Sequence, residues 1–264
     1  MINIKAIIYL LIVLIVSSYV TYSDKTPPEV GIEEQLGATI PLDLKFTSSK
    51  GDTLSLREII DKPVILSFAY YHCPGICTPL LTGLSEAVNI MDLEPGKDYR
   101  LVTISFDHTE GSAIAEKWRK TYAEGMKRKI PVDAWYFMTG DSLSIKKLTS
   151  SVGYYFKSDG KEDFIHPAAI MAISSKGKVV RYLFGTKFLP FDLKMAVIEA
   201  QEGRITPTIN KVLNFCFSYD PQGRKYVLDV TKIAGAVSLF FVAIFLVILL
   251  IKGRKNKLNK KELS

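Results

Sequence analysis

One apolar and β-prone run, Val64–Tyr70, constrains the fold of this chain more than any other feature. Because the run has no polar face, it is typical of a strand buried on both sides in the middle of a sheet. It is followed by Thr78–Met91, where leucine, valine and methionine recur every three or four residues, as in a helix with one apolar face. A buried strand followed by such a helix predicts an α/β fold with helices packed on a central sheet.

The same alternation of strands and helices continues along the chain. The patterns predict a first hairpin and short helix, then strands and helices in turn, and finally a second hairpin and helix: Pro41–Phe46 with Thr53–Leu56, Leu56–Ile60, Tyr99–Phe106, Ser112–Ala123, Trp135–Met138, Ser142–Val152, Ala168–Ser174 with Val179–Phe184, and Phe191–Glu202. In sheets with parallel strands, binding sites gather at the carboxyl ends of the strands. Cys73 and Cys77 lie at such an end, directly after the first long strand.

The two cysteines are four residues apart, around Pro74-Gly75-Ile76. If the chain enters its helix near Cys77, both sulfurs can point to one side, and the helix N-terminus favours a thiolate over a thiol. Thiolates are soft ligands that select Cu(I), and they are also the nucleophiles of disulfide exchange. The pair therefore predicts a metal site or a redox site. A structural disulfide is a third interpretation, although a bridge across so short a loop constrains the unfolded chain little.

A histidine distinguishes these interpretations. His166 lies just before the predicted strand Ala168–Ser174. In a thioredoxin-like arrangement the loop before this strand faces the N-terminus of the first helix, so the imidazole can complete a Cys2His set. The alternative is a solvent-exposed loop histidine. His72 is adjacent to Cys73, but its side chain is expected to point away. His108 follows the second strand, at the mouth of the site or on the loop surface.

Two apolar segments predict a membrane-anchored, exported protein. Residues 1–23 contain Lys5 and then the apolar run Ile7–Val16, the pattern of a signal peptide, with an uncleaved anchor as the alternative. Near the C-terminus, Ile233–Ile251 has 19 residues without a charge, which is long enough for a transmembrane helix. Between these segments we expect a linker at 24–36, one folded domain at 37–202 and a connector at 203–232.

The chain has 264 residues and a formal net charge of +7, but this charge is not spread over the domain. The segment 252–264 holds six cations against one glutamate: Lys252, Arg254, Lys255, Lys257, Lys260, Lys261 and Glu262. Such a tail stays in the cytoplasm by the positive-inside rule, which places the domain on the extracytoplasmic (periplasmic) side of the cell membrane. A nucleic-acid partner is therefore not expected. A third cysteine, Cys216, lies between two phenylalanines, and we expect it to be an inert thiol.

Three segments of this chain resemble the SCO/SenC family, the copper chaperones of cytochrome c oxidase assembly: SFAYYHCPGICTPLL, LVTISFDHTEG and IHPAAIMAISSKGKVV. Their order and separation match the family over approximately residues 37–202. The resemblance implies a thioredoxin-like domain that binds one copper ion, as Cu(I) or Cu(II), through Cys73, Cys77 and His166. It also implies a supporting role for Asp107. From the residues alone, zinc with a water as fourth ligand would fit the same set.

The resemblance further implies that copper is delivered to the CuA centre of cytochrome c oxidase subunit II, or that the cysteines of that subunit are reduced. Such a protein is a metallochaperone rather than an enzyme. The alternative is a thiol-disulfide oxidoreductase or redox sensor that uses Cys73 and Cys77, with incidental copper binding. The chain departs from the family at Gly75, Thr78 and Pro167, and in having its predicted anchor at the C-terminal end.

Overall fold

The computed structural model describes residues 28–160, 163–205, 217–220 and 225–228, together with Val242 and Phe245. The helices are α2 Leu56–Ile59, α3 Cys77–Ile90, α4 Ser112–Arg119, the π-helical turn η1 Lys120–Glu124, α5 Ser142–Ser151 and α6 Pro190–Glu202. The strands are β1 Gly31–Ile32, β2 Lys45–Ser48, β3 Thr53–Ser55, β4 Val64–Ala69, β5 Arg100–Ser105, β6 Trp135–Thr139, β7 Tyr154–Tyr155, β8 Lys157–Ser158, β9 Phe164–Ile165, β10 Ala169–Ile173, β11 Val179–Phe184, β12 Phe217–Asp220 and β13 Lys225–Leu228.

A mixed sheet forms the centre of the described domain, with the strand order β11-β10-β4-β5-β6-β2-β3. The strands β4, β5 and β6 are parallel, whereas β10 runs antiparallel to β4 and β2 runs antiparallel to β6. All six residues of β4 are buried, as expected for a strand covered on both faces. This arrangement confirms the prediction of an α/β fold with a central sheet flanked by helices, and it agrees with a thioredoxin-like layout.

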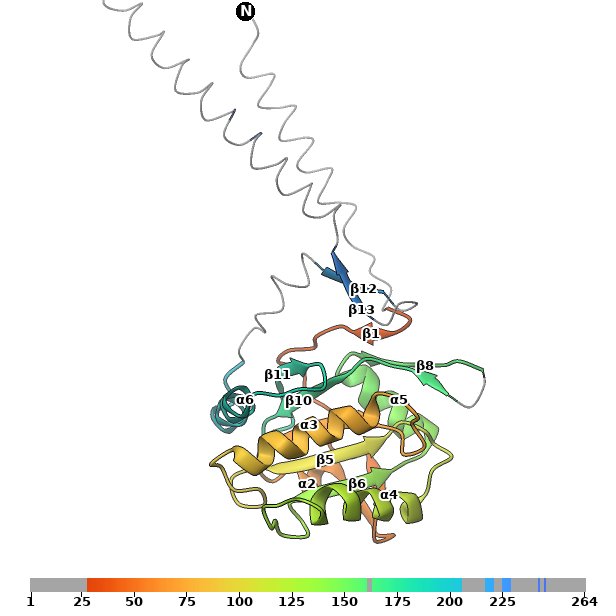
Figure 1. The fold of residues 1–264 in the computed structure, drawn as a ribbon, viewed down its shortest axis with the longest axis vertical. Coiled ribbons are helices and arrows are strands. Elements are labelled where there is room, and N and C mark those ends of the chain that lie inside the picture. Colours follow the sequence, from red (N-terminus) through yellow and green to blue (C-terminus); the bar gives the residue numbers. More distant parts are fainter. Residues whose placement is uncertain are drawn as a thin grey trace, which may run out of the picture.

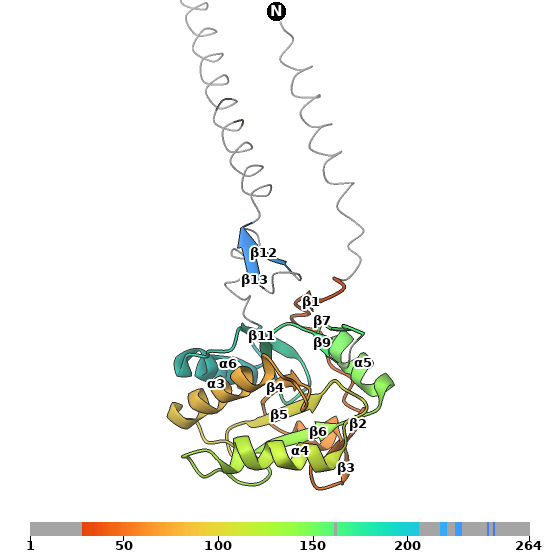
Figure 2. The same cartoon turned by 45° about the vertical axis from the view of Figure 1, so that its right-hand side comes forward.

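Three helical segments lie side by side on one face of the sheet. The helix α3 contacts α6 on one side and η1 on the other, and η1 directly continues α4 (Figures 1 and 2). Two parallel crossovers in the same direction, β4-α3-β5 and β5-α4-β6, place α3 and α4 on the same face because such connections are right-handed. The helix α5 instead packs against β7, and Asp141 caps it by accepting hydrogen bonds from the amides of Leu143 and Ser144.

The structure differs from the predicted elements at several places. The strand β2 begins at Lys45 rather than Pro41, because the carbonyls of Leu42 and Leu44 accept hydrogen bonds from the start of α2. The predicted helix Ser112–Ala123 changes to a π-helical turn at Lys120. Within the predicted linker 24–36, β1 pairs with β7. Within the predicted connector 203–232, β12 pairs with β13.

The predicted signal segment 1–23 and Cys216 lie outside the described residues, as does the predicted transmembrane segment apart from Val242 and Phe245. Among the residues that the structure does describe, we find no helix with the length and apolar character needed to cross a bilayer.

Candidate metal centre

The two predicted thiols lie where the chain leaves β4 and enters α3. The turn after Ala69 is closed by a hydrogen bond from the Cys73 amide to the carbonyl of Tyr70, and α3 then begins at Cys77. Ile76 provides no side-chain cap for this helix, so the partial positive charge of its N-terminus is directed at the turn. Cys73 is half-buried and Cys77 is completely buried. The more exposed thiol, Cys73, is therefore the one that a partner can reach.

The third predicted ligand, His166, comes from a part of the domain that is distant from the two cysteines in the sequence. His166 follows β9, lies just before β10 and is buried. Because β10 pairs with β4, this segment lies next to the turn that carries the cysteines. The Nε2 atom of His166 lies 3.5 Å from the Sγ atom of Cys77. The structure thus brings Cys73, Cys77 and His166 together.

The spacing of these three side chains fits a bound metal ion. One donor atom from each residue, two sulfurs and one imidazole nitrogen, lies within 4.8 Å of both others. Metal–sulfur and metal–nitrogen bonds of about 2.0–2.3 Å place the ligand atoms of one ion roughly 3.5–4 Å apart. Small side-chain movements therefore suffice to close the site around one ion, and its soft donors suit copper or zinc rather than a hard cation.

The environment of His166 fixes which ring nitrogen carries the proton. The carbonyl oxygen of Pro167, which can only accept, lies 3.1 Å from Nδ1. The hydroxyl of Tyr154 donates to the same carbonyl and lies 3.1 Å from Nδ1, so toward the ring its oxygen accepts. Both neighbours therefore require a proton on Nδ1. In the neutral ring this leaves a lone pair on Nε2, the nitrogen that faces Cys77 and can ligate a metal.

The two cysteines share one proton in the metal-free site. The pKa of the Cys73 thiol is lowered to about 4, chiefly by the hydrogen bond that the Cys77 thiol donates to it, next by its hydrogen bond with the His166 side chain, and further by the backbone amides of Cys77 and Gly75. The pKa of Cys77 rises far above its usual value, first because it donates this hydrogen bond and then because it is buried. Cys73 is therefore a thiolate at neutral pH, ready to bind a metal ion or attack a disulfide.

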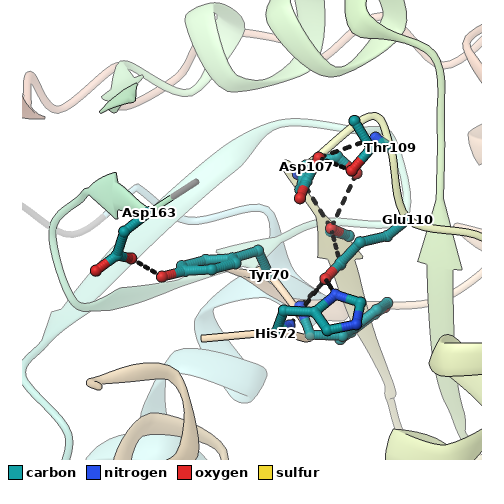
Figure 3. A network of polar contacts seen from close by, with 8 residues as sticks. Tyr70, His72, Asp107, Thr109, Glu110 and Asp163 are labelled. Carbon is teal, nitrogen blue, oxygen red and sulfur yellow. Dashed lines mark hydrogen bonds and ion pairs between the residues drawn. The ribbon is translucent and has the colours of Figure 1, made fainter. Parts of the chain in front are cut away.

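The loop that carries His166 is attached to β4 through an aromatic cluster. The hydroxyl of Tyr70 donates a hydrogen bond to Asp163, three residues before His166 (Figure 3). The ring of Phe106 lies 5.0 Å from the His166 ring, and Phe164 packs edge-on against both Tyr70 and Phe106. These contacts limit the movement of the imidazole and keep its surroundings apolar on one side.

A cavity of about 370 Å3 opens onto the site, lined by residues that include Cys73 and His166. A wider groove of about 1150 Å3 adjoins it, with Pro74, Asp163 and Phe164 lining both. His108 lines only the groove, so the structure does not bring it to the thiols. The groove and the cavity together give a partner access to the exposed side of Cys73.

Neither Asp107 nor His72 belongs to the donor set. Asp107 accepts hydrogen bonds from the amide and hydroxyl of Thr109, so it shapes its own loop (Figure 3). The His72 side chain is mostly exposed and points to Glu110, with 2.8 Å between Nδ1 and Oε1. Sequence patterns gave no indication of Glu110 or of Tyr154, which contact the site through tertiary structure rather than through a local motif.

Comparisons with known proteins agree with this geometry. A model of the SCO1/SenC family matches residues 33–189, more than half of the chain. The SCO1 protein homolog of Bacillus subtilis (strain 168) is 25% identical over 150 residues, which cover 56% of this chain and 75% of that protein.

Solved structures share the fold. The structure of a protein of Aquifex aeolicus VF5 matches with a TM-score of 0.58 and 26% identity, and the match covers 64% of this chain and 96% of that protein. The structure of Arabidopsis thaliana ScoI, solved with copper bound, matches with a TM-score of 0.51, and the match covers 64% of this chain and 99% of that protein. Its 19% identity makes it a relative in fold alone. With the family match over residues 33–189, these findings establish that the chain belongs to the SCO1/SenC family.

Proposed function

We propose that this chain binds one copper ion through Cys73, Cys77 and His166 and hands it to a CuA-type site, that of cytochrome c oxidase subunit II or a similar protein, during assembly. The observation that carries the proposal is the convergence of two sulfurs and one imidazole nitrogen within 4.8 Å. Two thiolates and a neutral imidazole are soft and borderline donors, and soft donors favour Cu(I) over hard cations. Membership of the SCO1/SenC family supports copper over zinc.

The unequal exposure of the donors supports transfer rather than storage. Cys77 and His166 are buried, whereas Cys73 is half-buried beside the 370 Å3 cavity. A ligand from a partner can therefore approach the ion on the side of Cys73 and displace that sulfur first. Stepwise replacement of one thiolate by another keeps the ion bound throughout the exchange.

We also propose that the domain faces the extracytoplasmic side of the cell membrane, tethered by the 233–251 segment with its basic tail in the cytoplasm. The support is the 19-residue uncharged run and the six cations that follow it. On that side of the membrane, thiols are oxidised unless a metal or a reductant protects them. A reporter enzyme that is active only outside the cytoplasm tests this orientation when it is fused after residue 205 and, separately, after residue 264.

A thiol-disulfide oxidoreductase is the second candidate, supported by the thiolate at Cys73. In this reaction Cys73 attacks a disulfide of the oxidase subunit, and one cysteine of that subunit leaves as a thiolate. Cys77 then loses its proton and attacks the mixed disulfide. The subunit gains two thiols, and this chain is left with a Cys73–Cys77 disulfide. The reaction needs both cysteines but not the His166 imidazole.

Deleting the gene and growing the cells in copper-poor medium tests the proposed function. We expect CuA-type oxidase activity to fall and to recover with added copper or with the parent chain. Full activity in the deletion strain under these conditions would contradict the proposal. A His166→Ala chain separates the two candidates: a chaperone loses activity together with copper, whereas an oxidoreductase keeps its activity.

A further inference from the structure

A buried carboxylate, that of Glu110, lies behind the turn that carries Cys73. Glu110 belongs to the loop between β5 and α4, and only 1% of its side chain is exposed to solvent. Burying an ionised carboxylate is costly unless hydrogen-bond donors surround it. Glu110 is far from Cys73 in the sequence. The hydrogen-bond donors that surround its carboxylate indicate the role of this side chain.

Four donors converge on the two carboxylate oxygens (Figure 3). Oε2 accepts from the amide of Tyr71 at 2.8 Å and from the hydroxyl of Ser105 at 2.6 Å. Oε1 accepts from the amide of His72 at 2.8 Å, and Nδ1 of the His72 ring lies at the same distance. Because carboxylate oxygens accept, these four groups are placed to donate to Glu110, which offsets the cost of burying it.

Two of these donors are backbone amides of the segment that leads to Cys73. Tyr71 and His72 come after the end of β4, beyond the last residue that pairs with β5. Their amides therefore have no partner in the sheet, and Glu110 provides one for each. Ser105, at the end of β5, holds the same carboxylate from the sheet side. The backbone before Cys73 is thus fastened to the sheet through one side chain.

The charge of Glu110 also acts on the site itself. Its Oε1 accepts from the amide of His72, the residue directly before Cys73, so this buried carboxylate is one residue along the backbone from a proposed ligand. In the low dielectric of a protein interior such a charge is screened only weakly. A fixed negative charge beside a bound metal favours the ion of higher positive charge. For copper, it favours Cu(II) over Cu(I).

We propose that Glu110 is a positioning residue that fixes the Cys73 turn and, through its buried charge, lowers the Cu(II)/Cu(I) reduction potential of the site. This inference rests on the proposed function, because it presupposes copper at Cys73, Cys77 and His166. It gives the chain a means of holding copper in either oxidation state. Sequence patterns alone did not assign Glu110 any role.

The test compares reduction potentials of the full chain loaded with one copper ion and titrated with dithionite, which supplies one electron per Cu(II). Glu110→Gln keeps the shape and one acceptor oxygen but removes the charge. We expect the ratio of Cu(I) to Cu(II) affinity to rise by about tenfold, which for a one-electron couple is a potential about 59 mV higher. Ser105→Ala keeps the charge and removes one hydrogen bond, so its potential should match the parent's.

Glu94→Gln is the matched control for charge. Glu94 has an exposed side chain and follows the far end of α3, so its loss should leave the potential unchanged. An unchanged potential in Glu110→Gln, or an equal rise in Glu94→Gln, would overturn the role of the charge. A parent chain that takes up no copper would instead contradict the proposed function, so the two failures are distinguishable.

Hydrogen exchange in the unaltered chain tests the positioning role even if Glu110→Gln does not fold. We expect the amides of Tyr71 and His72 to exchange slowly, because both are bonded to a buried carboxylate. Where Glu110→Gln folds, the same two amides should exchange faster than in the parent. Rapid exchange of both amides in the parent would overturn the positioning role.

Discussion

The hydroxyl of Tyr154 lies 3.1 Å from Nδ1 of His166 and donates to the carbonyl of Pro167, 2.9 Å away. A single side chain thus connects the ring and the backbone of the same loop. Its hydrogen is committed to the carbonyl, so toward the ring the hydroxyl oxygen accepts. Tyr154 comes from β7, at the end of α5, and it orients a histidine twelve residues further along the chain.

Tyr154→Phe should weaken copper binding by about tenfold, the lower end of the effect usual for partners of metal-binding histidines. The loss is partial because the Pro167 carbonyl still accepts from Nδ1. A competition titration with a copper chelator measures it. The control is Tyr182→Phe, which removes another buried hydroxyl with two hydrogen bonds, to Val152 and Gln35, away from the site. Equal affinities in both variants would contradict the role of Tyr154.

Cys73 should react as a thiolate in mildly acidic solution. Its pKa is lowered to about 4, so the ionised fraction, and with it the rate of alkylation by iodoacetamide, should stay nearly constant from pH 8 down to about pH 6. In the chain unfolded with guanidinium the pKa returns to about 8.5, and the rate should fall roughly tenfold per pH unit below that value. Mass spectrometry of the reduced, metal-free chain locates the label. A folded chain with the same pH dependence as the unfolded one would refute the shift.

Tyr70→Phe should loosen the loop that carries His166. The substitution removes the hydrogen bond to Asp163 and leaves a half-buried carboxylate oxygen with one partner fewer, at a cost of about 0.5–1.5 kcal/mol in the free energy of unfolding. Backbone amides of residues 163–166 should then exchange faster with solvent. Tyr71→Phe is the control, because that hydroxyl donates to the Met138 carbonyl in the core. If the two variants exchanged alike at 163–166, the Tyr70–Asp163 bond would not hold the loop.

Gly83→Ala should destabilise the domain and disturb the wall of the metal cavity. A Cβ atom at Gly83 would lie 1.9 Å from the carbonyl oxygen of Thr186, so α3 and the loop after β11 must move apart. Thr186 lines the cavity beside Cys73. We expect a loss of about 1–3 kcal/mol in denaturant unfolding of the metal-free chain. Gly75→Ala, with open space around the new methyl group, should cost far less. Similar losses of stability in both variants would show that the close approach of Gly83 to Thr186 is not what destabilises Gly83→Ala.

The elements around the site could be predicted from sequence because their patterns are local. The run at Val64–Tyr70 corresponds to β4, and the helical spacing at Thr78–Met91 corresponds to α3 within one residue at each end. Local signals also gave the hairpin of β10 and β11. Together with the resemblance to the SCO/SenC family, these elements were sufficient to expect Cys73, Cys77 and His166 in one place.

The supporting residues could not be predicted in the same way. Glu110 stands in the polar stretch Asp107–Gly111, which looks like a solvated loop, and it is buried only because four donors from other parts of the fold meet it. Tyr154 follows α5, and the residues next to it in the sequence give no indication of its hydrogen bonds. The pairing of β12 with β13 was foreseeable, since Asp220-Pro221-Gln222-Gly223 is a typical turn sequence between two β-prone segments.

The central claim is that copper is held by two thiolates and one imidazole from distant parts of the chain. The most direct measurement is the copper stoichiometry and affinity of the purified full chain in mild detergent, under reducing conditions, for the parent and for Cys73→Ser, Cys77→Ser and His166→Ala. His108→Ala is the control, because His108 lines the wide groove and not the cavity. We predict one tightly bound copper ion in the parent and in His108→Ala, and a large loss of affinity in the other three. Full stoichiometry and unchanged affinity in Cys73→Ser and Cys77→Ser would contradict the account.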